Sequence, residues 1–168
     1  MIVEYIDLDE PLQLFEVMVQ CRAAEGEEAY LAAAIIPAAR ALAESKTGCA
    51  IRQARYRDTF ADASRCVLSM GGVMAVESVT VGGSPVAYTS TVQARRTCIS
   101  APDHAGKECI VTYTAGTDIN HHPGVRAWML LVCGWLYAQR ELLGGDNKEP
   151  PPHIAESLLA SINVAAGF

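Results

Sequence analysis

The sequence lacks the common signatures of catalysis. It contains no G-x-S-x-G nucleophile elbow, no Walker loop, no G-x-G-x-x-G turn and no H-E-x-x-H pair. The pairs Gly71-Gly72 and Gly82-Gly83 indicate turns, because neither opens a helix whose N-terminus would hold a phosphate. These absences argue against an enzyme and give no support for a cofactor.

Positive charge is also scarce. The 168 residues include 13 Lys and Arg against 19 Asp and Glu, which gives a net charge of −6. This charge argues against a nucleic-acid-binding module that works by neutralising phosphates. It is compatible with a protein that lets DNA pass without holding it. With 51% hydrophobic and 19% charged residues, the composition is that of a globular chain long enough for one domain.

No targeting signal or membrane span is evident. The first residues, MIVEYIDLDE, lack the basic and long apolar regions of a signal peptide, so we expect a chain that is not exported. The stretch from Ala127 to Ala138 has no charged or strongly polar side chain, but it is shorter than the roughly 20 apolar residues that span a bilayer. An apolar helix of this kind needs cover on several sides, from its own domain or from neighbouring subunits.

The cysteines show no metal or redox spacing. There is no C-x-x-C pair, and a chain in a reducing compartment needs no disulfides. Cys133 lies within the apolar stretch, where cysteine packs as a small hydrophobic residue. We therefore predict structural thiols at Cys21, Cys49, Cys66, Cys98, Cys109 and Cys133.

Two helices are predicted at the N-terminal end. The first begins near Asp9 and Pro11 and places Leu14, Phe15, Met18 and Cys21 at helical spacing. The second runs from Glu27 to Lys46 with Gly48 as its stop, and Pro37 within it predicts a kink. Its many alanines would allow another helix to pack closely.

A β-rich segment follows. We expect strands over 51–60, 65–68, 73–81, 85–88 and 92–99, and a last strand that ends at Gly116, with Gly82-Gly83 as a hairpin turn. The predicted class is α+β: a small helical bundle of about four helices with an antiparallel β-meander inserted between the second helix and the long core helix. Its predicted segments form one domain, 1–168: a helix pair over 1–48, the meander over 49–116, the core helix over 117–145, and a Pro-rich loop, terminal helix and docking tail over 146–168.

Two groups of polar residues are candidate sites. His121 and His122 are adjacent, but no acidic or cysteine partner stands at ligand spacing, so a loop at a helix start is the favoured interpretation and no metal site is predicted. Basic residues in two predicted strands are candidates for contact with a partner or with DNA, and a solvated or subunit-pairing strand face is the alternative that the net acidity favours. These basic residues are Arg52, Arg55, Arg57, Arg95 and Arg96.

Three stretches together resemble the head–tail connector (adaptor) family of long-tailed double-stranded DNA bacteriophages. The second predicted helix ends Ala38-Ala39-Arg40, Glu44, Thr47-Gly48, similar to the family's A-A-R…E…T-G. The segment 111–116 is similar to V-x-Y-x-A-G, and the core helix closes over 137–141, similar to Y-x-x-R-E. Pro37 and the 51–108 segment depart from the family's pattern.

The resemblance implies a virion protein of the neck that is assembled in the host cytoplasm. It implies a homo-oligomeric ring, usually of twelve copies, that lies below the portal protein, continues the DNA channel and offers a platform for head-closure or tail proteins. Double-stranded DNA would pass without sequence-specific binding, and no membrane is involved. The C-terminal segment commonly reaches the portal in relatives, which assigns portal docking to Ile162, Val164 and Phe168.

Two alternatives stay open at this point. The first is a head-closure or tail-completion protein lower in the neck. The second, from another class, is a small metal- or thiol-dependent enzyme that uses His121, His122 and a cysteine; stoichiometric zinc or iron in the purified protein would favour it.

Overall fold

The chain packs as two compact units. A computed structural model describes residues 1–139 and 153–164. One unit, here called the β unit, comprises 1–8, 48–117 and 163–168, and the other, the helical unit, comprises 9–47 and 118–162. The α+β class predicted from the sequence is confirmed.

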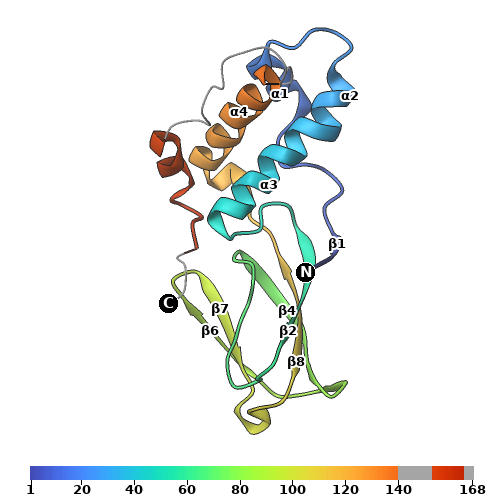
Figure 1. Ribbon diagram of the computed structural model, residues 1–168, viewed down its shortest axis with the longest axis vertical. Coiled ribbons are helices and arrows are strands. Elements are labelled where there is room, and N and C mark those ends of the chain that lie inside the picture. Colours follow the sequence, from blue (N-terminus) through green and yellow to red (C-terminus); the bar gives the residue numbers. More distant parts are fainter. Residues whose placement is uncertain (140–152, 165–168) are drawn as a thin grey trace. The chain divides into compact units, whose positions relative to one another are not determined.

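The helical unit is built around α4 (Pro123–Ala138), which lies against α1 (Leu14–Cys21) and α3 (Ile36–Thr47) (Figure 1). It also packs on two short 3₁₀ segments, η3 (Ile119–His121) and η4 (His153–Leu159). These contacts cover the apolar helix on several sides, as expected, but not all round, because Leu131 is 46% exposed. It begins at Pro123 and not at 117, because the preceding residues form a loop and η3. Its expected end at 145 lies outside the described residues.

The first helix starts later than predicted. α1 begins at Leu14, and Gln13 at its N-cap donates its backbone N–H to the Glu16 carboxylate at 3.4 Å. Residues 9–12 stay outside the helix because tertiary contacts hold them: Leu12 is buried and Glu10 binds Arg40. Phe15, one of the apolar residues at helical spacing, is 74% exposed.

Pro37 is accommodated by a change of helix type. The second helix consists of α2 (Glu28–Tyr30), a π-helical turn η1 (Leu31–Ile35) and α3, and Gly48 follows with φ +65° as the predicted stop. A proline ring clashes with the carbonyl four residues before it in an α-helix, and the wider π turn provides room there. The structure therefore has a π turn where the sequence predicted a kink. The expected terminal helix is the 3₁₀ segment η4.

The β unit contains two antiparallel sheets and not a simple meander. The five-stranded sheet has the order β1-β2-β8-β4-β5, so that β8 (Cys109–Ala115) lies between β2 (Ala54–Phe60) and β4 (Val73–Val81). The N-terminal edge strand β1 (Ile2–Tyr5) was not predicted, whereas the hairpin into β5 (Ser84–Pro85) was. The second sheet has the order β3-β7-β6.

The predicted strand over 92–99 is wrong. The chain instead forms a hairpin of β6 (Thr89–Gln93) and β7 (Arg96–Ser100), and β7 also pairs with β3 (Cys66–Val67). Its two turn residues, Ala94 and Arg95, have φ of +47° and +65°. A two-residue turn of this kind usually carries Asn-Gly or a similar pair, so Ala-Arg gives no sequence signal. The core of the β unit draws buried residues from both sheets, among them Cys66, Val79, Ile99, Val111 and Tyr113.

Candidate interaction surfaces

The first family-like motif is a buried ion-pair cluster in the helical unit. The Arg40 guanidinium donates to Glu10 through Nε at 2.7 Å and through Nη2 at 3.3 Å, and to Glu44 through Nη1 at 2.9 Å. The side chain of Arg40 is only 7% exposed. The arginine and glutamate of A-A-R…E thus form an i,i+4 pair that also anchors the segment before α1.

The second motif is the centre of the β unit. Val111, Tyr113 and Ala115 are fully buried on β8, and the Tyr113 ring stacks on Tyr56 with centroids 5.5 Å apart. The Tyr113 hydroxyl donates to Asp58 at 3.0 Å. Gly116 ends the motif because a Cβ there would lie 2.8 Å from the Cα of Gln53.

Asp58 is the polar hub of this core. Its carboxylate accepts the backbone N–H and the hydroxyl of Ser69 at 2.8 and 2.9 Å, and the amine of Met1 at 3.1 Å. Burial by itself raises the pKa of the Asp58 carboxyl, but these hydrogen bonds, with that of Tyr113, outweigh it and hold the pKa below its ordinary value. Burial raises the pKa of the Tyr113 hydroxyl, and the negative charge of Asp58 adds to this effect.

The third motif is described only in part. The Tyr137 hydroxyl, on α4, donates to the Glu27 carboxylate, which also accepts the backbone N–H of Ala24 at 3.0 Å. Arg140 and Glu141 lie outside the described residues. Each motif therefore contributes side chains that join distant parts of the sequence.

The three arginines predicted within one strand differ in their surroundings, and Arg52 lies outside that strand, because β2 begins at Ala54. Arg55, on the outer face of β2, pairs with Glu77 at 2.8 Å and with Glu4. Arg52 donates to the backbone oxygens of Asp7 and Leu8 at 3.0 and 2.8 Å and lies over the Tyr5 ring. Arg57 is exposed. Internal carboxylates and carbonyls thus use much of the hydrogen-bonding capacity of Arg52 and Arg55, and contact of these arginines with a partner or DNA stays a prediction.

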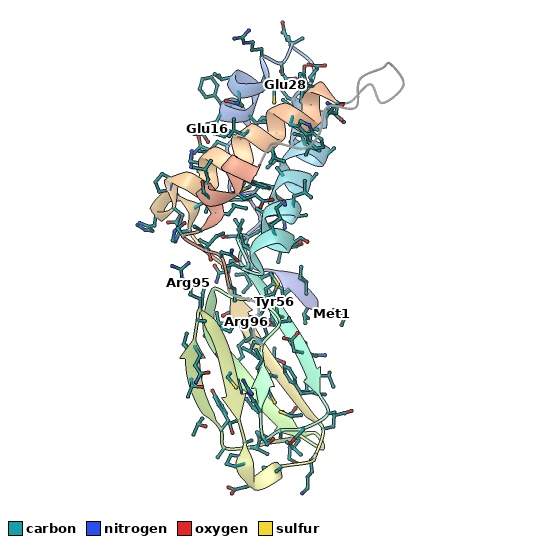
Figure 2. All side chains as sticks on the ribbon, turned by 60° about the vertical axis from the view of Figure 1, so that its left-hand side comes forward. Met1, Glu16, Glu28, Tyr56, Arg95 and Arg96 are labelled. Carbon is teal, nitrogen blue, oxygen red and sulfur yellow. The ribbon has the colours of Figure 1, made fainter. Side chains whose placement is uncertain are left out.

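The two remaining arginines lie at the tip of the β6–β7 hairpin (Figure 2). Arg95 is an exposed turn residue and Arg96 is half-buried at the start of β7. Both were expected inside one strand. Their position at a turn changes the surface that they would offer to a partner.

The predicted docking residues of the C-terminal segment are not alike. Ile162 and Val164 are 3% and 6% exposed, and Phe168 lies outside the described residues. Val164 belongs to the β unit, where it packs against Gly48 and Gly71. Docking of this segment on a portal stays a prediction, and it would have to compete with these internal contacts.

His121 and His122 have different polar neighbours. His121 lies 3.6 Å from the Asp118 carboxylate, and Nδ1 of His122 lies 3.1 Å from the Ser161 hydroxyl. Among residues 1–139 and 153–164, no group of three or more His, Cys, Asp or Glu side chains is placed to hold a metal ion. Over the same described ranges, no helix is long and apolar enough to cross a membrane.

Exposed apolar side chains form two surfaces that the sequence patterns do not predict, one on α1 and one on the N-terminal segment. Phe15 and Val19 lie one turn apart on α1 and are 74% and 62% exposed. The N-terminal segment exposes Ile2, Val3 and Leu8. An i,i+4 apolar pair is itself a sequence signal, but it predicts a buried face unless the packing partner is known.

Comparison with known proteins shows the fold. No family model matches the sequence, and no curated protein is detectably similar to it. A chain of the structure described as "Virion of native gene transfer agent (GTA) particle" aligns over 98% of this chain and 96% of its own length, with a TM-score of 0.71 and 17% sequence identity. A chain of the "Neck of empty GTA particle computed with C6 symmetry" aligns over 100% and 97%, with a TM-score of 0.68 and 18% identity. Across nearly its whole length, the chain shares its fold with these virion chains.

Proposed function

We propose that the protein is a structural component of a phage-like virion neck: an adaptor that forms a ring below the portal, continues the DNA channel and joins head to tail. The observation that carries the proposal is the fold shared with a chain from a GTA neck, over 100% of this chain and 97% of that one. The family-like motifs support it, because Arg40, Tyr113 and Tyr137 serve as packing anchors and not as a reactive site.

A ring of twelve copies is part of the proposal. The neck neighbour was computed with C6 symmetry, and a twelve-membered ring contains a six-fold axis. The net charge of −6 suits a channel wall on which DNA does not stick, since like charges repel. In this arrangement the C-terminal segment meets the portal and the β unit meets the next neck component.

Deletion of the gene from its phage or host genome tests the function. We expect DNA-filled heads without attached tails in electron micrographs, and restoration of complete particles by the wild-type gene supplied in trans. Tailed particles of normal infectivity or transfer activity would contradict the proposal.

Cryo-electron microscopy of the complete particle tests the position. We expect twelve copies between portal and tail, with an acidic channel wall. Density for this fold elsewhere in the neck would favour a head-closure protein, and a basic wall would contradict the proposed charge effect.

A further inference from the structure

Two glycines of the β unit form a socket that Val164 fills. We call Gly48 and Gly71 the glycine socket: the Gly71 N–H donates to the Gly48 carbonyl at 2.7 Å, and the Gly71 carbonyl accepts the N–H of Ala50 at 3.1 Å. Val164 lies over both glycines and is 6% exposed. A single aliphatic side chain thereby connects the C-terminal segment to the residues that follow α3.

Gly71 is needed for space and not for its backbone conformation. Its φ does not lie in the left-handed region, so an alanine would be unstrained in the backbone. A Cβ on Gly71, however, would lie 2.3 Å from Cγ2 of Val164, a distance that real contacts do not reach. Its next neighbours, the carbonyl oxygens of Arg95 and Gly48, would be at 3.4 Å, which is ordinary contact. The space at Gly71 is therefore matched to Val164.

We propose that the glycine socket is a binding site for the C-terminal segment of this chain, and that Val164 docked there is withheld from the portal until the neck assembles. The second part rests on the proposed function. A valine side chain in the socket cannot contact a portal at the same time, so the two sites compete for it. Full burial of a valine favours the docked state about tenfold to a hundredfold, and the apparent affinity for the portal falls by that factor.

Four full-length proteins test the socket: wild type, Gly71→Ala, Val164→Ala and the double variant, with Val92→Ala as the control because Val92 is 70% exposed. Hydrogen–deuterium exchange of the peptide over 160–168 is the measurement. We expect about tenfold faster exchange in Gly71→Ala, and no change in Val92→Ala. Unchanged exchange in Gly71→Ala would overturn the proposal.

The double variant separates the socket from a general loss of folding. With alanine at 164 the clashing methyl is absent, so Gly71→Ala should add little destabilisation in urea to that of Val164→Ala. The contrary result is that Gly71→Ala lowers the stability of the Val164→Ala protein as much as it lowers that of the wild type. That result would show that Gly71 makes room for something other than Val164, and it would overturn the proposal.

Portal binding tests the competition. The Gly71→Ala variant keeps its whole C-terminal segment, so we expect it to bind the portal ring about tenfold more tightly than wild type in a surface-binding assay. Equal or weaker binding would overturn the competition. If neither protein binds the portal, both the proposed function and the proposed competition are wrong. The hydrogen-exchange result still tests, by itself, whether Val164 docks in the glycine socket.

Discussion

Replacement of Arg40 by methionine should strongly destabilise the helical unit. The guanidinium makes three hydrogen bonds to Glu10 and Glu44, whose side chains are 17% and 11% exposed. Methionine fits the helix as well as arginine does, but it leaves two nearly buried carboxylates without this partner. Removal of one member of a buried pair costs about 3–5 kcal/mol, and we expect the low end here because Glu10 is partly solvated.

Tryptophan fluorescence in urea is a suitable assay. Trp128 and Trp135 are the two tryptophans of the chain, and both lie on α4, so their emission reports on the helical unit. With a urea slope of about 2 kcal/mol per molar, a loss of about 3 kcal/mol lowers the unfolding midpoint by about 1.5 M.

The same helix provides the control. Lys46 on α3 pairs with Glu156 at 2.7 Å, but both side chains are nearly half exposed. Lys46→Met should therefore cost less than about 1 kcal/mol. Adding Glu10→Gln and Glu44→Gln to the Arg40 variant should restore part of the lost stability, because no buried charge is then unpaired. Equal midpoints for the Arg40 and Lys46 variants would refute this reasoning.

Three further predictions concern the pH response, a close backbone approach and the thiols. The pKa of Asp58 is lowered in the folded state, so its contribution to the free energy of unfolding is present above the ordinary pKa of 3.8 and is lost as the pH falls through the folded pKa. Asp58→Asn should therefore be less stable than wild type at neutral pH. Its free energy of unfolding, measured by urea titration, should fall less than that of wild type from about pH 5 to pH 2. A steeper acid loss in that variant would contradict the assignment. Gly116→Ala should lower stability by about 1–3 kcal/mol in circular dichroism melts, since its Cβ would meet the backbone of Gln53, and an unchanged melt would contradict the close approach. Burial raises the pKa of Cys66 and Cys133 to about 12, so neither thiol should react with an aromatic disulfide at pH 8 until urea is added; rapid labelling of the native protein would contradict their burial.

Local patterns predicted several elements well. Alternating residues and Gly82-Gly83 indicated β4 and its hairpin, and the apolar run indicated α4 as the core helix. Gly48 was correctly predicted as a helix stop. These features depend on a residue's own conformational preference or on a period along the chain, both of which are present in the sequence.

Elements whose formation depends on distant partners were missed. The edge strand β1 exists because its backbone pairs with β2, about fifty residues away, and all four of its residues are exposed, so no pattern marks it. The hairpin at Ala94 and Arg95 lacks the usual turn residues. Phe15 has helical spacing, yet its side chain is exposed.

Local sequence patterns were enough to predict the α+β class and the core helix α4, and they contain the three motifs whose order resembles an adaptor. What these motifs do depends on contacts made in the folded chain: Arg40 binds Glu10, thirty residues away, and Tyr113 binds Asp58, fifty-five residues away. The tertiary structure also decided that Val164 lies against Gly71 instead of projecting as an exposed apolar residue. The physical reason is that a one-dimensional pattern records which face of an element is apolar, whereas its packing partner is set by strand order and chain crossing.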